Sequence, residues 1–79
     1  MPKRRKAPAA LVQLRSRFKT ALAEAGLTMA AWAELNGWSR AHVVLVLAAD
    51  RESEKVLDAV RAFTGEQEDV MRKRLAIAS

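Results

Sequence analysis

Residues 28–49 read TMAAWAELNGWSRAHVVLVLAA, and this stretch decides how the chain folds. The run VVLVL at 43–47 is rich in β-branched residues and would, taken alone, suit a buried strand. No other segment alternates polar and apolar residues convincingly, so such a strand would have no partner to pair with. Ser39, just before the run, is a favourable N-cap residue. The context therefore predicts a helix from Arg40 to about Ala49.

Two further helices are predicted before this one. In residues 9–25 apolar side chains recur every three or four positions, as on one side of an amphipathic helix. Gly26 is expected to end that helix in a left-handed conformation. Thr28 is a suitable N-cap for a short second helix that runs to about Asn36, where Gly37 breaks it.

Two more helices are predicted after it. Asp50 or Ser53 can cap a fourth helix, which continues at helical spacing to Phe63. Residues 64–67, TGEQ, have the form of a capping box and predict that a fifth helix begins there and spans residues 65–77. We therefore expect an all-α, compact bundle of about five short helices, with one folded domain over residues 9–79.

The composition excludes several classes of protein. The 79 residues allow one domain, and the absence of cysteine with a single histidine argues against disulfides and zinc. No apolar run approaches the roughly 20 residues that span a bilayer, and no signal-peptide region is present, so we expect a soluble cytoplasmic protein. No carboxylate pair, nucleophile–base pair or phosphate-cradling glycine loop is evident. We expect neither an enzyme nor a metal, cofactor or small-molecule site.

The formal charge of +5 is unevenly distributed. Residues 1–19 and 70–79 together carry ten basic side chains and no acidic one, whereas residues 20–69 carry four basic and nine acidic side chains. Residues 1–8, MPKRRKAP, are predicted to form a flexible basic arm. Lys3, Arg4, Arg5 and Lys6 would bind the phosphates of a nucleic acid in a salt-sensitive way, unless the arm serves only as a solubilising tail.

Residues 28–49 also contain the side chains that two closely crossing helices need. Ala33 is small enough for the helix contact, Gly37 tolerates a positive φ in the turn, and Trp38 can fill the core after it. Val43, Val46 and Leu47, at spacings of three and four, can bury one side of the second helix against the first, and Trp32 is expected in the core. Together with Ser39, these residues resemble the lambda-repressor/Cro-like helix-turn-helix proteins, and more narrowly small regulators of bacteriophages and mobile elements. Asn36 departs from this pattern, since a large aliphatic residue is usual before the glycine.

The resemblance implies that the exposed early side of the 40–49 helix enters the DNA major groove. Arg40 would read guanine through O6 and N7, and Ala41, Val44 and Leu45 would contact thymine methyl groups. Val44 and Leu45 could instead pack against another protein. Thr28 and Ser39, at helix starts, would lie near phosphates.

Two features of the sequence leave alternatives open. His42 could contact a phosphate, or it could be a structural or merely solvated histidine. In the 65–77 helix, Val70, Met71, Leu75 and Ile77 would form a homodimer interface, as is frequent in the family. Alternatively, residues 72–74 would form a second phosphate-binding patch on a monomer.

These features together predict a sequence-specific DNA-binding transcriptional regulator. We expect a repressor that binds double-stranded DNA at a palindromic operator as a homodimer, and that is associated with the bacterial nucleoid. One alternative is a protein-binding adaptor or antitoxin-like module that uses the apolar 40–49 helix for docking. Another is a non-specific nucleoid-type DNA binder that depends mainly on the basic arm.

Overall fold

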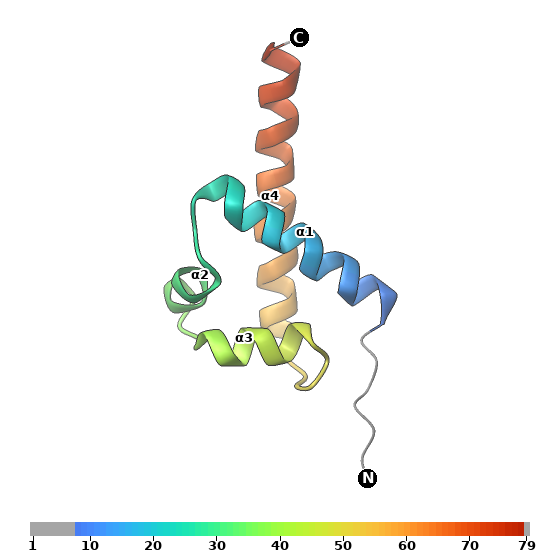
Figure 1. Ribbon diagram of the computed structural model, residues 1–79, viewed down its shortest axis with the longest axis vertical. Helices are drawn as coiled ribbons and strands as arrows, with labels where there is room; N and C mark the ends of the chain where they lie inside the picture. The colour runs from blue at the N-terminus through green and yellow to red at the C-terminus, as the bar shows by residue number, and fades with distance from the viewer. Residues whose placement is uncertain (1–7, 79) are drawn as a thin grey trace.

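The computed structural model describes residues 8–78, and this part of the chain is all-helical, without a strand (Figure 1). The helices are α1 (Ala9–Ala25), α2 (Met29–Leu35), α3 (Arg40–Leu47) and α4 (Glu54–Ala78). The VVLVL run lies in α3, so the helical interpretation of it is confirmed. The predicted arm, including Lys3 to Lys6, lies outside the described residues except for Pro8.

The prediction of a fourth and a fifth helix was wrong, because a single helix, α4, covers both segments. The capping box predicted at residues 64–67 does not form. Thr64 lies inside α4 with its side chain fully buried, about one helical turn beyond the buried Val60 and two turns beyond the buried Val56. An N-cap residue must leave the helical conformation, which would interrupt this continuous buried side of the helix. Gly65 inside the helix costs only about 1 kcal/mol relative to alanine, so packing decides the outcome.

The buried hydroxyl of Thr64 allows a test of whether this residue lies inside a continuous helix or caps a separate one. Its Oγ1 has no hydrogen-bond partner within the described part of the structure, and an unsatisfied buried hydroxyl costs about 1–3 kcal/mol. Thr64→Val has nearly the same shape and is expected to raise the free energy of unfolding by about 1 kcal/mol. Urea denaturation followed by circular dichroism measures the change. Were Thr64 an N-cap, the substitution would instead lower stability by about 1 kcal/mol.

Three of the predicted helix starts are confirmed by side-chain hydrogen bonds. Thr28 Oγ1 accepts from the N–H of Ala31 at 3.0 Å, and Ser39 Oγ accepts from the N–H of His42 at 3.1 Å. At the start of α4, where two caps were possible, Ser53 Oγ accepts from the Val56 N–H at 3.3 Å. Three short polar side chains thus determine where α2, α3 and α4 begin.

The ends of α1, α2 and α3 share one hydrogen-bond arrangement, the Schellman motif. After α1, for example, the N–H groups of Gly26 and Leu27 bond to the carbonyls of Ala23 and Leu22. The residue that turns the chain is left-handed in each case, with φ of 70° at Gly26, 79° at Gly37 and 65° at Ala49. The third position is an alanine, so the sequence contains no glycine that would predict this turn. Helix α3 ends at Leu47, two residues earlier than predicted, with Ala49 in the turn.

Ala49 is therefore a site where a glycine should stabilise the fold. A left-handed conformation costs a non-glycine residue roughly 1–2 kcal/mol, which glycine avoids. Part of the gain is lost because glycine adds freedom to the unfolded chain. Ala49→Gly is expected to raise the free energy of unfolding by about 0.5–1 kcal/mol. The same change at Ala23, which is helical and exposed, should lower it by about 1 kcal/mol and is the matched control in thermal denaturation.

The core lies where α1 and α4 cross and where α2 and α3 pack against both. Phe18 of α1 is fully buried at its centre, with its ring edge-to-face against Trp32 at a centroid distance of 4.8 Å and against Phe63 at 5.9 Å. Val43, Val46 and Leu47 of α3 contribute to the same cluster. The C-terminal part of α4 extends beyond the other helices (Figure 1), along the 54 Å long axis of the molecule.

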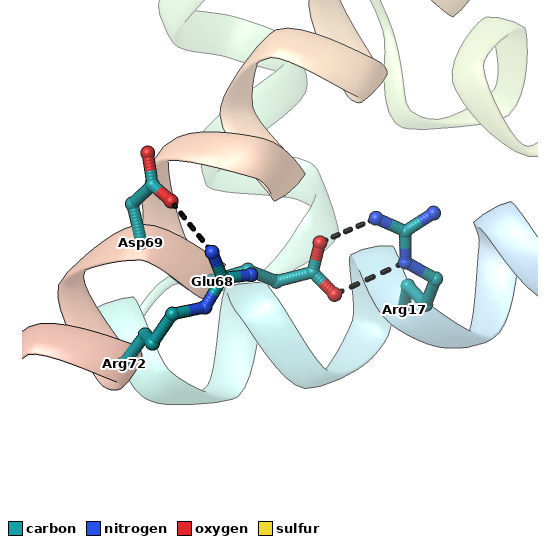
Figure 2. Close-up of polar contacts among 4 residues, drawn as sticks. All are labelled: Arg17, Glu68, Asp69 and Arg72. Carbon is teal, nitrogen blue, oxygen red and sulfur yellow. Dashed lines mark hydrogen bonds and ion pairs between the residues drawn. The ribbon is translucent and has the colours of Figure 1, made fainter. Parts of the chain in front are cut away.

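A bidentate ion pair joins α1 to α4 at the surface (Figure 2). Arg17 Nε donates to Glu68 Oε2 at 3.0 Å, and Nη2 donates to Oε1. This hydrogen bonding holds the pKa of the Glu68 carboxyl below its usual value and raises the pKa of Arg17. Since the pair is largely exposed, it contributes little to stability but fixes the relative position of the two helices.

Candidate nucleic-acid interface

Helices α2 and α3 are joined by residues 36–39 and run in clearly different directions, with α2 seen nearly end-on in Figure 1. Ala33 of α2 is fully buried. The left-handed Gly37 turns the chain, and the N–H of Trp38 bonds to the Ala33 carbonyl at 2.9 Å. The Asn36 side chain closes the end of α2 by donating to the Trp32 carbonyl at 2.8 Å, which explains how a polar residue is accommodated there.

The division of α3 into an inner and an outer side agrees with the sequence prediction. Val43, Val46 and Leu47 are at most 2% exposed. Trp32 is also buried, as predicted, whereas Trp38 is only partly buried against the core. The inner side of α3 is thus fully used for packing, and any partner must meet its outer side.

The four predicted base-reading residues lie on or beside that outer side. Arg40 and Ala41 are exposed, Val44 is 36% exposed and Leu45 is partly exposed. Residues 38–49 contain no acidic side chain, and their polar side chains are those of Ser39, Arg40 and His42. The outer side is therefore largely apolar and positively charged at its N-terminal end. Its contact with DNA stays a prediction.

The hydroxyls predicted to lie near phosphates are used as caps. Thr28 and Ser39 each accept one backbone N–H, which leaves the hydroxyl proton of each available to a phosphate oxygen. Both residues are exposed. Capping and phosphate binding are therefore compatible at both positions.

Sequence reasoning missed one basic side chain beside α3. Arg51, in the loop after α3, lies next to the partly buried His42, and its Nη1 is 3.0 Å from His42 Nδ1. The contact depends on the left-handed turn at Ala49, which nothing in the alanine-rich sequence indicates. The only signal in the sequence was that Arg51 follows α3 closely.

The basic C-terminal segment carries less free charge than its sequence suggests. Arg72 pairs with Asp69 at 3.7 Å (Figure 2), and Arg74 pairs with Glu24 of α1 at 3.8 Å. Two of the three basic residues at 72–74 thus have carboxylate partners, which weakens the alternative of a second phosphate-binding patch. The four predicted dimer-interface residues are accessible: Val70, Leu75 and Ile77 are 43%, 72% and 85% exposed, and Met71 is partly exposed.

A hollow of about 640 Å³ opens between the start of α1, the α3–α4 loop and the start of α4. Leu11, Val46 and Leu57 form its apolar part, and Glu52 and Glu54 contribute carboxylates. Arg51 lines the same hollow, but its guanidinium contacts His42 of α3, and the two carboxylates disfavour a phosphate group inside the hollow. Within residues 8–78 no group of three or more acidic, histidine or cysteine side chains could hold a metal ion. The outer side of α3 is therefore the candidate interface.

Comparison of the chain with protein-family models, curated proteins and solved structures found no match. None of the helices within residues 8–78 is long and apolar enough to cross a membrane.

Proposed function

We propose that the protein is a sequence-specific DNA-binding transcriptional regulator in which α2 and α3 form a helix-turn-helix and α3 enters the major groove. The observation that carries the proposal is the division of α3. Its inner side is fully buried, while its outer side presents Arg40 with small and apolar neighbours. The buried Ala33 and the left-handed Gly37 support the close helix contact and tight turn of this motif.

The chemistry of the outer side suits base reading. A guanidinium at the start of α3 can bond guanine O6 and N7 together, and Ala41 and Val44 offer methyl groups to thymine. The small side chain of Ala41 also lets the helix backbone come close to the base edges. Thr28 and Ser39 would fix the register of the helices by bonding phosphates.

We further propose that the protein binds DNA as a homodimer through the projecting end of α4. A second copy packed antiparallel would cover Val70, Leu75 and Ile77, which are otherwise accessible. The same arrangement would bring the acidic Glu66 of one helix near the basic Lys73 of the other, because α4 is acidic before residue 70 and basic after it. Such a two-fold dimer would bind two half-sites and repress by occluding a promoter.

A protein-binding adaptor remains the second candidate, because large apolar side chains are exposed on both helices of the proposed motif. Leu35 of α2 is 75% exposed, and Val44 of α3 is 36% exposed. A docking partner would bury such residues. In a non-specific DNA binder, by contrast, the basic arm would contribute most of the affinity.

A salt titration with three variants separates these functions. DNA reading predicts that affinity for mixed-sequence duplex DNA falls steeply with salt, and that Val44→Asp abolishes selective binding. Val12→Asp on α1, where the valine is 43% exposed, is the matched control and should bind as the unchanged protein does. An absence of DNA binding even at low salt would reject the proposal. Removal of residues 1–7 should weaken binding without altering sequence preference. If the protein is instead a non-specific DNA binder, this removal abolishes binding, and Val44→Asp has no effect on it.

A further inference from the structure

We propose that Arg51 and His42 form a phosphate-binding pair at one edge of the outer side of α3, with His42 positioning the Arg51 guanidinium. This inference rests on the proposed DNA binding. It adds a phosphate contact from Arg51, which follows α3 in the sequence, to the contacts proposed at the start of that helix. Its basis is the 3.0 Å contact between Arg51 Nη1 and His42 Nδ1.

The turn after α3 brings these residues together. With Ala49 left-handed, the N–H of Asp50 bonds back to the Leu45 carbonyl at 2.9 Å, and that of Ala49 bonds to the Val46 carbonyl at 3.1 Å. The chain therefore reverses at the end of α3, and Arg51 lies beside a residue nine positions earlier. Its guanidinium is held next to the helix by the backbone turn as well as by the imidazole.

The chemistry of the contact fixes the proton on the imidazole. A guanidinium has only N–H donors, so His42 Nδ1 must accept, and the proton of the neutral ring is on Nε2. Because the partner in this contact is a neutral nitrogen rather than a carboxylate, the contact itself does not neutralise the positive charge of Arg51. Both the remaining guanidinium N–H groups and the Nε2–H can donate to an anion.

The position of the pair fits a phosphate better than a base. Successive α-helical residues are rotated by about 100°, which sets Arg40 and Val44 on one edge of the outer side and His42 on the opposite edge. Ala41 and Leu45 lie between them. A helix in the major groove faces the base edges at the floor of the groove and has a phosphate backbone on each side. A pair at the edge would therefore bind a backbone phosphate.

The test is a double-mutant cycle on a duplex bearing a site selected from random DNA. Arg51→Ala is expected to lower affinity about 5–10-fold and to reduce the slope of log K against log[salt] by about 0.9, with the preferred sequence unchanged. His42→Ala should have a similar effect, and the double variant should lose little more than either single variant. His42→Asn, whose side-chain oxygen can accept from Arg51, should recover most of the salt slope.

Arg61→Ala is the matched control, since Arg61 is an exposed arginine of α4 with its own partner, Asp58. If the alanine variant at position 51 loses helix content, Arg51→Gln repeats the test with the side-chain stem retained. The pairing would be overturned if the Arg51 variants bound DNA as well as Arg61→Ala does. It would also be overturned if the losses of binding free energy at positions 42 and 51 were fully additive in the double variant. Either result would leave the proposed DNA binding intact. If the unchanged protein bound no DNA, the proposed function itself would fail.

Discussion

Phe18→Ala is expected to remove about 3–5 kcal/mol of stability, the largest effect of any single substitution proposed for this chain. Phe18 is fully buried between Trp32 and Phe63, so the truncation would lose both edge-to-face contacts and leave a cavity that neighbouring helices cannot fill. Small domains have a total stability of about 5–15 kcal/mol, of which this is a large fraction. Urea denaturation followed by far-ultraviolet circular dichroism measures the loss.

Two control variants show whether the loss of stability comes from removal of the buried ring. Phe18→Leu retains most of the volume and should cost clearly less than the alanine variant, whereas Val12→Ala, at an exposed position of α1, should cost little. A loss below about 1 kcal/mol for Phe18→Ala would contradict the packing of the aromatic cluster, because a buried phenylalanine cannot be truncated at so small a cost.

Arg40→Ala is expected to lower affinity for the selected DNA site by about 1–3 kcal/mol, or roughly 5–150-fold. The loss should be accompanied by relaxed preference at one base pair, because the bidentate contact with guanine disappears. Binding to the selected duplex and to duplexes with single base-pair changes measures both effects. Arg40→Lys should recover affinity only in part, since a lysine cannot reproduce the planar two-donor geometry.

The control for this prediction is again Arg61→Ala, which removes one positive charge far along the chain from α3. If Arg40→Ala lost affinity equally for every sequence, Arg40 would be a phosphate contact and base reading would belong to other residues. Retention of both affinity and preference would remove α3 from the DNA interface.

The parts of the fold that depend on local sequence were predictable. Thr28 and Ser39 were identified as caps because an N-cap requires only a hydroxyl and the following three backbone N–H groups. The inner side of α3 was identified from the spacing of Val43, Val46 and Leu47, because helical periodicity relates spacing to direction. Nearby residues contain all the information that these predictions need.

The errors arose where distant residues decide the conformation. The local pattern at residues 64–67 suits a helix start, but burial of Thr64 beside Val56 and Val60 keeps α4 continuous. The pairing of Arg17 with Glu68 depends on how α1 crosses α4, over a separation of 51 residues. Counting charges along the chain therefore overestimated the basic groups free to bind a polyanion.

The candidate site was predicted in part for the same reason. Arg40, Ala41, Val44 and Leu45 were placed on one side of a helix from their spacing alone, and the structure leaves all four accessible. Arg51 was missed because its position depends on the left-handed conformation of Ala49, which is unfavourable for alanine and cannot be inferred from it.

Selecting bound sites from a pool of random duplex DNA tests the claim that α3 reads DNA sequence. The claim predicts a recurring two-fold symmetric site with half-sites about 10 base pairs, one helical turn, apart. It also predicts that Arg40→Ala selects sites with one position in each half relaxed. A bound pool with the same sequence composition as the starting pool would contradict the claim.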